Sequence, residues 1–169
     1  MVIWIIGISG SGKSTLGNML KKYFDEEGLD SQIIDGDVVR SFFNDDLGYG
    51  AEDREQNIKR ILLASSLLES NGIVPIICNI GPFEHLRLFA REKFNNYIQI
   101  YLYKRMENAK KNDVKNIYRD NVDVTPIVGI DLLFEEPEFN ELVLKVDDES
   151  KEESLKKIID YLESLKNED

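Results

Sequence analysis

A glycine-rich run near the start of this chain constrains its fold more than any other feature. Residues 7–15 read GISGSGKST, which matches the pattern GxxxxGK[ST] at Gly7, Gly12, Lys13 and Ser14. An apolar stretch at 2–8 precedes the run and an amphipathic stretch follows it, so the run joins a buried strand to a helix. This order of strand, loop and helix is typical of a phosphate-binding loop.

Each residue type in this loop has a chemical reason to be there. Glycines let successive backbone N–H groups converge on phosphate oxygens, and the helix N-terminus adds a positive dipole end. We expect Lys13 to reach the β- and γ-phosphates of ATP and the Ser14 hydroxyl to ligate Mg²⁺. A glycine-rich turn without a ligand is the alternative. The predicted ATP-binding residues are Gly7, Ser9, Gly10, Ser11, Gly12, Lys13, Ser14 and Thr15.

Apolar runs of strand length alternate with amphipathic runs of helix length along the rest of the chain. This pattern predicts an α/β fold of the P-loop NTPase type, with a doubly wound parallel sheet of about five strands and helices on both faces. The expected strands are 2–8, 32–34, 73–80, 97–103 and 142–146, and the expected helices are 13–27, 53–71, 83–94 and 150–165.

The length of 169 residues fits one domain, and we expect residues 1–169 to form a single kinase domain. Between the fourth and fifth expected strands lies a polar, basic stretch with little periodicity. Long segments of this kind inside a compact domain are usually functional, so residues 104–128 are predicted to be a lid.

Composition and charge exclude several classes of protein. The 32 Asp and Glu residues outnumber the 21 Lys and Arg residues, so the surface repels a polyphosphate backbone and no nucleic-acid partner is expected. The single cysteine, Cys78, lies in an apolar run, which favours a buried structural thiol in a reducing compartment. The run at 2–8 is far too short to span a membrane. We therefore expect a cytoplasmic protein without membrane contact.

A second cluster, Asp35-Gly36-Asp37, follows the second expected strand. Open α/β sheets bind ligands at this end of their strands. A carboxylate there can orient or deprotonate an acceptor hydroxyl and can also hold a water on Mg²⁺. Asp-Gly-Asp is also a common surface turn, but the nearby phosphate loop favours function. We predict that Asp35 acts with Lys13 in catalysis and that Asp37 joins Ser14 at the metal.

Arg40, Arg54 and Asn57 form a third cluster, in which Arg54 lies one helical turn before Asn57. Guanidinium groups are planar and carry several donors, so they suit an anionic acceptor better than lysine does. Alternatively, Arg54 belongs to a surface ion pair with Asp53 or Glu55.

Together these motifs resemble adenylylsulfate kinases. The specific matches are GISGSGKST, IIDGDVVR at 33–40 and LGYGAEDREQNIKR at 47–60; GPFEHLRLFARE at 81–92, DVKNIYR at 113–119 and GIDLLFEEPE at 129–138 match more loosely. The resemblance covers nearly the whole chain. It implies transfer of the γ-phosphoryl group of ATP, with Mg²⁺, to the 3′-hydroxyl of adenylyl sulfate, a nucleotide acceptor, by an enzyme that is often a homodimer.

The resemblance also implies roles for individual residues. It places Asp35 at the acceptor ribose hydroxyl, and it places the third cluster on the acceptor's anionic portion. Tyr49 stacks on the acceptor base, Ile80 lines the pocket, and Lys115 is the lid lysine near the transferred phosphate charge. The expected acceptor-binding residues are Asp35, Asp37, Arg40, Tyr49, Arg54, Asn57, Ile80, Lys115 and Ile127.

The chain departs from this family around the acceptor base. Family members carry a second aromatic ring where this chain has Ile127, and the usual Ser and Arg around Pro82 are Gly81 and Glu84. Losing one face of an aromatic stack costs about 0.5 to 1.5 kcal/mol beyond area burial. A neighbour such as Phe134 is one possible replacement for the missing ring.

These departures leave several functions open. A cytidine diphosphoramidate kinase of a capsule or surface-polysaccharide pathway is one, because a pyrimidine offers less area for stacking than a purine. A kinase of a small metabolite such as a sugar is another. A catalytically silent ATP-binding regulatory module is an alternative of a different class, which the presence of both Lys13 and Asp35 disfavours.

Four further residues carry weaker expectations. His85 is expected at the surface and Trp4 in the core. Asp147 and Asp148 follow the last strand, and we expect them to cap the final helix.

Overall fold

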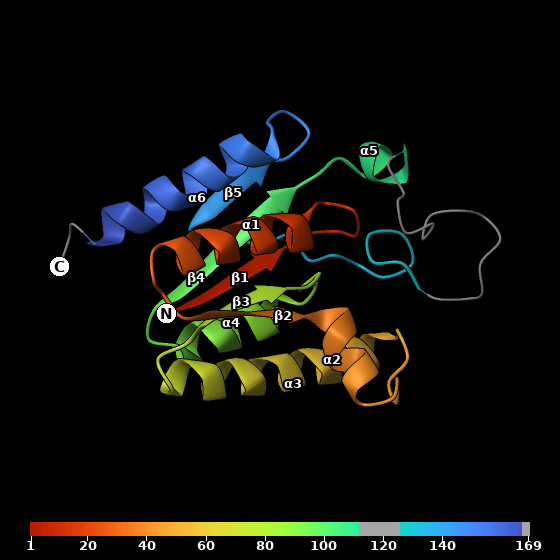
Figure 1. Cartoon of the computed structure of the whole chain (residues 1–169). Coiled ribbons are helices and arrows are strands. Elements are labelled where there is room, and N and C mark those ends of the chain that lie inside the picture. The colour runs from red at the N-terminus through yellow and green to blue at the C-terminus, as the bar shows by residue number, and fades with distance from the viewer. Residues whose placement is uncertain (112–125, 167–169) are drawn as a thin grey trace.

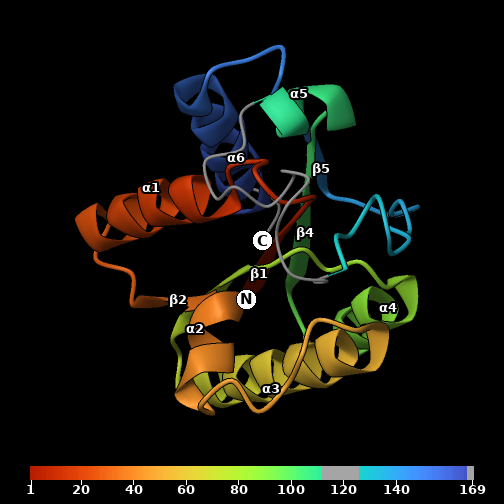
Figure 2. The same ribbon diagram turned by 90° about the vertical axis from the view of Figure 1, so that its right-hand side faces the viewer.

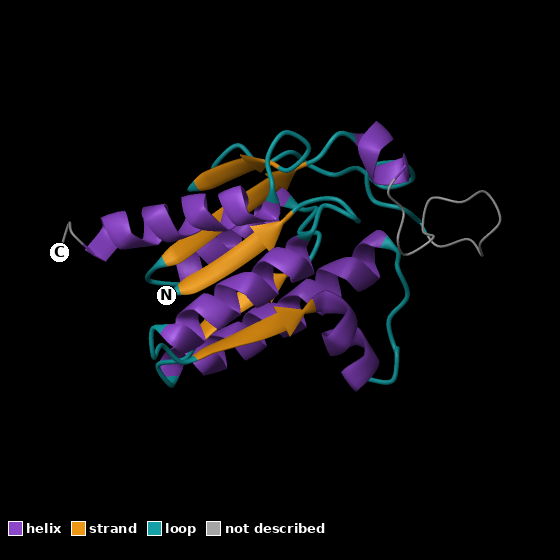
Figure 3. Ribbon diagram, turned by 45° about the horizontal axis from the view of Figure 1, so that its top comes forward, coloured by secondary structure: helices purple, strands orange, loops and turns teal. Residues whose placement is uncertain are grey.

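Five parallel strands form one sheet in the computed structural model, which describes residues 1–111 and 126–166. The strands run in the order β2-β3-β1-β4-β5, and each neighbouring pair is parallel. All five carboxyl ends therefore meet at one edge of the sheet, as the orange arrows in Figure 3 show. The strands are β1 (Val2–Ile6), β2 (Ser31–Asp35), β3 (Val74–Cys78), β4 (Tyr97–Tyr103) and β5 (Leu142–Lys145).

Helices cover both faces of this sheet, which confirms the predicted α/β class. In Figures 1 and 2, α1 and α6 lie on one side of the strands and α3 and α4 on the other. None of the helices in the described part of the chain is long and apolar enough to cross a membrane. The helices are α1 (Lys13–Glu26), α2 (Gly36–Phe42), α3 (Ala51–Ser70), α4 (Glu84–Lys93), α5 (Met106–Lys111) and α6 (Lys151–Lys166).

Strand β1 is the centre of the sheet and separates two apolar cores. Because side chains alternate along a strand, Trp4 packs with the core beneath α3 and α4, whereas Ile3 and Ile5 pack with the core beneath α1 and α6. Every side chain of β1 is fully buried. The expected core position of Trp4 is confirmed, and the loop that leaves β1 starts from a rigid base.

Two helices differ from the sequence expectations. Helix α2 begins directly after Asp35, where no helix was expected, because the Asp35 carboxylate caps it by accepting a hydrogen bond from the Asp37 N–H at 2.8 Å. Helix α5 lies within the predicted lid, where a weak apolar pattern gave no indication of it. Residues 112–125, including Lys115, lie outside the described residues, so the lid remains a prediction.

The cap of α6 corrects another expectation. Ser150 Oγ accepts a hydrogen bond from the Glu153 N–H, and the Glu153 carboxylate accepts one from the Ser150 N–H, which is a capping box. Asp147 and Asp148 do not cap the helix. Asp147 accepts a hydrogen bond from the Arg105 N–H at 2.7 Å, and Asp148 forms an ion pair with the Arg105 side chain.

Candidate active site

The glycine-rich loop connects the buried end of β1 to α1 through backbone conformations that favour glycine. Gly12 has a φ of 93°, and a side chain at Gly7 (φ 148°) would place its Cβ 2.7 Å from the Leu102 carbonyl oxygen. The Gly7 N–H donates to the Ile80 carbonyl at 3.3 Å, which fixes the loop against the end of β3. Ser9, Gly10 and Ser11 follow in the loop, and Ser14 and Thr15 lie in the first turn of α1.

The N-terminus of α1 is arranged to accept an anion. Its capping residue, Gly12, offers no side-chain hydrogen bond to the first turn, so backbone donors at this end require another partner. Lys13 folds back over the loop and donates from Nζ to the Ile8 carbonyl at 2.8 Å. A loop of convergent N–H groups with a lysine beside it fits the phosphates of ATP.

Asp35 lies against the loop because β3 places the ends of β1 and β2 side by side. Cys78 at the end of β3 pairs with Ile5 on one side and with Asp35 on the other. The Ser14 Oγ–H donates to Asp35 Oδ2 at 2.9 Å. The predicted metal ligand and the predicted acceptor carboxylate are therefore in direct contact.

The oxygen atoms beside the phosphate-binding loop suit Mg²⁺. A serine hydroxyl that donates its proton to Asp35 keeps its lone pairs for a cation, and carboxylates such as Asp37 in the first turn of α2 are hard oxygen ligands. Within residues 1–111 and 126–166, no group of three or more His, Cys, Asp or Glu side chains is placed to hold a metal ion. Mg²⁺ is usually held by one or two carboxylates together with substrate phosphates, which matches such a site.

Cys78 is buried next to the loop, as expected. Its Sγ–H donates to the Lys13 carbonyl at 3.6 Å. Burial, with a smaller contribution from the Asp35 charge, raises the pKa of the thiol to about 12. Because the thiolate is the reactive form, Cys78 is a structural residue of this site.

Arg40 and Arg54 lie together on the acceptor side of the sheet and are held by main-chain carbonyls. Arg40, only 4% exposed, donates from Nη1 to the carbonyls of Leu47, at 3.1 Å, and Gly48. Arg54 donates from Nε to the Tyr49 carbonyl at 2.8 Å and from Nη2 to the Pro126 carbonyl at 2.9 Å.

Neither guanidinium forms an ion pair with any residue that the structure describes. The alternative ion pair of Arg54 with Asp53 or Glu55 is wrong, because Arg54 donates to the Tyr49 and Pro126 carbonyls and Glu55 pairs with Lys59 at 2.8 Å. Burial, and then the neighbouring charge of Arg40, lower the pKa of Arg54. A buried and a half-buried cation that lie together without a carboxylate partner in residues 1–111 and 126–166 favour a bound anion.

Tyr49 forms one wall beside these arginines. The Cζ atoms of Arg40 and Arg54 lie 4.6 and 5.5 Å from its ring centroid, and the residue keeps 41% of its surface exposed. Phe134 does not replace the missing second ring, because it is 9% exposed and stacks on Tyr101 with ring centroids 5.7 Å apart. Ile127 is half-buried.

Two asparagines support the turn that carries Asp35. Asn57 is buried and donates from Nδ2 to the Gly36 carbonyl at 3.0 Å, while its Oδ1 has no partner in the structure. Asn79, which sequence reasoning missed, accepts a hydrogen bond from the Trp4 indole N–H at 2.7 Å and packs close to Gly36. Its position as a polar residue directly after an apolar strand is the sequence signal that could have identified it.

The departures at positions 81 and 84 have a structural explanation. Arg87 is 1% exposed, and it donates to the Gly81 and Glu135 carbonyls and to the Glu84 carboxylate. Glu84 therefore neutralises a buried charge. Gly81 has a φ of 58°, and a Cβ there would lie 2.7 Å from Ile6 Cγ2, so this backbone requires glycine.

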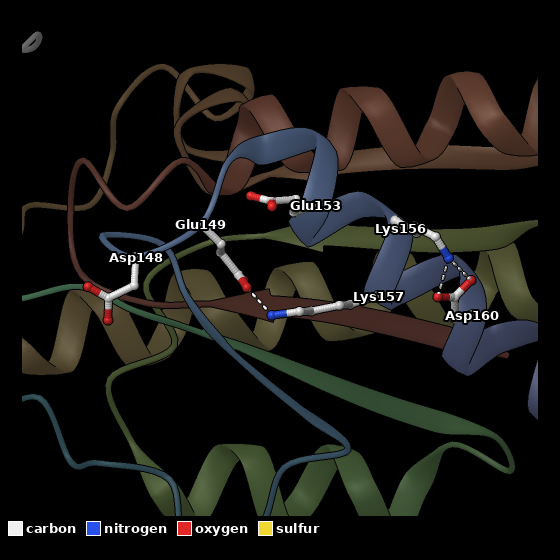
Figure 4. Close-up of a pocket in the computed structure, with 6 residues that line it drawn as sticks. All are labelled: Asp148, Glu149, Glu153, Lys156, Lys157 and Asp160. Atoms are coloured by element: carbon white, nitrogen blue, oxygen red, sulfur yellow. Dashed lines mark hydrogen bonds and ion pairs between the residues drawn. The ribbon is translucent and has the colours of Figure 1, made fainter.

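Two concavities are lined by residues that the structure describes. One, of about 530 Å³, is bounded by the loop residue Ile8, the end of β4 and segment 129–136. The other, of about 370 Å³, lies along α6, and Figure 4 shows its lysines directed at its acids, Lys156 at Asp160 and Lys157 at Glu149. His85 lies at the surface, as expected, 3.7 Å from Glu55.

Comparison with known proteins supports the same chemistry. A family model described as adenylylsulphate kinase matches residues 1–145. The adenylyl-sulfate kinase of Halothermothrix orenii is 34% identical over 165 residues, 96% of this chain and 89% of that protein. The probable adenylyl-sulfate kinase of Halalkalibacterium halodurans is 37% identical over 165 residues, 95% of this chain and 82% of that protein. The Mycobacterium tuberculosis APS kinase in complex with AMPPNP and APS superposes with a TM-score of 0.89 at 28% identity, covering 96% of each chain.

Proposed function

Because the chain belongs to the adenylylsulphate kinase family, we propose that it transfers the γ-phosphoryl group of ATP to the 3′-hydroxyl of adenylyl sulfate. One observation carries the proposal: the Ser14 hydroxyl of the phosphate-binding loop is hydrogen-bonded to Asp35 at 2.9 Å. Donor phosphates on the loop and an acceptor hydroxyl at Asp35 then meet at one point, which is the geometry that in-line transfer requires.

On the donor side, the loop binds the phosphates of ATP and neutralises their charge. Lys13 leaves the Ile8 carbonyl and turns to the β- and γ-phosphates, while loop N–H groups hold the same oxygens. Ser14 and Asp37 would hold Mg²⁺, which would supply positive charge to neutralise the charge that develops on the transferred group.

On the acceptor side, Asp35 accepts the proton of the 3′-hydroxyl or orients that hydroxyl for attack. Arg40 and Arg54 bind the anionic portion of the acceptor with the N–H groups that the main chain does not use. Tyr49 stacks on the base. Asn57 supports the turn, and Ile80, Ile127 and the lid residue Lys115 complete the predicted pocket.

The test is a kinase assay with purified protein. We expect ADP release only when ATP, Mg²⁺ and adenylyl sulfate are all present, with the new phosphate on the 3′-oxygen by ³¹P and ¹H NMR. Steady ADP release without adenylyl sulfate would indicate an ATPase, and the absence of both ADP release and transfer at saturating adenylyl sulfate would favour a silent ATP-binding module. Either result would refute the proposal.

A second acceptor, cytidine diphosphoramidate, is favoured by one observation. The chain has Ile127 where family members carry a second ring, and the Phe134 ring stacks on Tyr101. A pyrimidine loses less than a purine in a pocket with one aromatic wall. The same assay with both acceptors side by side decides between them by the ratio of kcat/KM values.

A homodimer and a cytoplasmic location also belong to this proposal. Sedimentation equilibrium gives the mass of the assembly, for which we expect twice 19.5 kDa. A monomer that turns over at the full rate would contradict the dimer without affecting the proposed reaction.

A further inference from the structure

Arg54 joins two segments that are far apart in the chain. Its Nε donates to the Tyr49 carbonyl at 2.8 Å, five residues away, and its Nη2 donates to the Pro126 carbonyl at 2.9 Å, 72 residues away. Tyr49 and Ile127, which follows Pro126, form the two walls of the proposed acceptor-base pocket. One side chain of α3 thus connects both walls before any acceptor is present.

The wall at Ile127 is a compact turn that is closed by its own hydrogen bonds. The Ile127 carbonyl accepts hydrogen bonds from the N–H groups of Ile130, Asp131 and Leu132. The Ile127 N–H donates to the Asp131 carboxylate at 2.8 Å. A hydrogen bond to the neighbouring Pro126 carbonyl therefore anchors the whole turn to α3.

The wall at Tyr49 is anchored from several directions. Arg40 holds the carbonyls of Leu47 and Gly48, and Arg60 forms a two-point ion pair with Asp46 at 2.7 Å. The Arg60 guanidinium also lies 4.0 Å from the centroid of the Phe43 ring. The loop at 43–50 is thus fixed to α2 and α3 independently of Arg54. Segment 126–132 is hydrogen-bonded to α3 through Arg54, and it also packs Val128 and Leu132 with the apolar core that includes α3 residues.

Arginine is suited to this connection. Its Nε and Nη2 groups lie on one edge of a planar fork, so two carbonyls bound along that edge are held at a fixed spacing. Nη1 and the second Nη2 hydrogen remain for a ligand. Its charge persists despite the lowered pKa, since an arginine stays protonated in a protein.

We propose that Arg54 is a positioning residue that assembles the acceptor-base pocket in advance by holding the turn at 126–132 against the Tyr49 loop. This rests on the proposed function for the identity of the pocket, and it goes beyond anion binding. Preorganisation lowers the ordering cost that the acceptor would otherwise meet on binding. Loss of the connection then weakens acceptor binding far more than the rate of transfer from a bound acceptor.

Hydrogen exchange of the ligand-free protein tests this directly, since it needs no activity. In Arg54→Lys, which keeps the positive charge but has one donor centre, we expect the amides of 127–132 to exchange about tenfold faster or more, the effect of losing a hydrogen bond to a charged group. The matched control is Arg60→Lys, which alters the other α3 arginine without touching Pro126. It should leave exchange at 127–132 unchanged.

Kinetics supply the second readout. Arg54→Lys should raise the acceptor KM about tenfold or more with kcat and the ATP KM within about threefold of wild type. Asp131→Ala loosens the same turn from the other side, without changing Arg54, and should raise the acceptor KM in the same direction. Thermal unfolding confirms that each variant is folded.

Two results would overturn the inference. Unchanged exchange at 127–132 in folded Arg54→Lys shows that Arg54 does not hold the turn, whatever the activity. A raised acceptor KM in Arg54→Lys with a wild-type KM in Asp131→Ala shows direct anion binding alone. Failure of the proposed function has a different signature, because wild-type protein then transfers no phosphate to adenylyl sulfate.

Discussion

Asp35 combines two tasks in one side chain. Oδ1 accepts the Asp37 N–H and so starts α2, while Oδ2 accepts the Ser14 hydroxyl of the phosphate-binding loop. The residue that we propose addresses the acceptor hydroxyl is thus held by hydrogen bonds at both oxygens. Such preorganisation is what makes electrostatic catalysis effective, since little reorganisation remains for the reaction.

The first prediction concerns the charge of Asp35. Asp35→Asn keeps the shape of the side chain but removes the base, so we expect ATP affinity within about threefold of wild type and kcat lower by about 10² to 10⁴. Lys13→Ala should abolish transfer. Isothermal titration with an ATP analogue and single-turnover kinetics measure the two effects separately.

The matched control is Asp30→Asn, an identical change at the amino end of β2, on the opposite edge of the sheet. It should leave kcat and the ATP affinity unchanged. Normal turnover in Asp35→Asn would show that this carboxylate has neither of the roles proposed for it.

At the level of elements, the strands were predictable because each one that is covered on both faces forms an apolar run. Helices α2 and α5 were not, since they are short and their formation depends on tertiary contacts. The loop at Gly7–Thr15 and the carboxylate Asp35 follow from local spacing. The partners of Arg54 do not, because Pro126 lies 72 residues away and no local pattern encodes that contact.

The packing of α1 on β3 gives the second prediction. Gly17 faces Cys78, and an added Cβ would overlap the Cys78 Sγ. Ala is normally favoured over Gly in a helix by about 0.8 to 1.0 kcal/mol, but overpacking costs about 1 to 3 kcal/mol. Gly17→Ala should therefore lower the free energy of unfolding measured in urea.

Two further variants isolate the cause of that loss. In a Cys78→Ala background the sulfur is absent, and Gly17→Ala should become neutral or stabilising. Asn18→Ala, at an exposed position of the same helix and away from the sulfur, reports the gain in helix propensity less the loss of the hydrogen bond that Asn18 Nδ2 donates to the Ser14 carbonyl at 2.7 Å. Equal losses in both backgrounds would rule out the clash with sulfur.

The capping box of α6 gives the third prediction. Ser150→Ala removes the hydroxyl that accepts the Glu153 N–H, so we expect a loss of about 1 kcal/mol in the free energy of unfolding. Asp148→Ala, two residues earlier and not part of the cap, should change it by less than about 0.5 kcal/mol. Chemical denaturation measures the free energy of unfolding of both variants. A larger loss in Asp148→Ala than in Ser150→Ala would indicate that the aspartates cap the helix.

At the level of the whole molecule, local charge and overall charge have opposite signs. The chain has a formal net charge of −11, yet Arg40 and Arg54 lie side by side without a carboxylate partner among the described residues. Dispersed surface charge is screened over about 10 Å at moderate salt, whereas the buried Arg40 and the half-buried Arg54 act at contact distance. This combination suits a small anionic nucleotide and opposes a nucleic acid.

Alkaline pH gives the fourth prediction. Burial raises the pKa of Cys78 from 9.0 to about 12 and that of Tyr101 from 10.0 to about 12, and it also raises the pKa of Tyr97. The unfolded chain loses these protons first. These groups therefore contribute their full share of the free energy of unfolding below about pH 9, and this contribution declines as the pH rises toward 12. The decline is about 1.4 kcal/mol per pH unit for each group that titrates only in the unfolded state.

Urea denaturation from pH 7 to pH 11 measures this decline. Cys78→Ala should remove the decline in unfolding free energy that begins near pH 9 and leave the decline that begins near pH 10. A free energy of unfolding that stays constant up to pH 11 would contradict the burial of all three groups.

The single thiol of this chain lies one hydrogen bond from the Lys13 carbonyl. Its sulfur–hydrogen stretch absorbs in an infrared window that other protein groups leave clear, and the frequency shifts with the strength of that bond. Any tightening of the loop around a nucleotide is then visible as a moving vibrational band. The Cys78 thiol is therefore an intrinsic infrared probe beside the phosphate-binding loop, and it needs no dye, label or isotope.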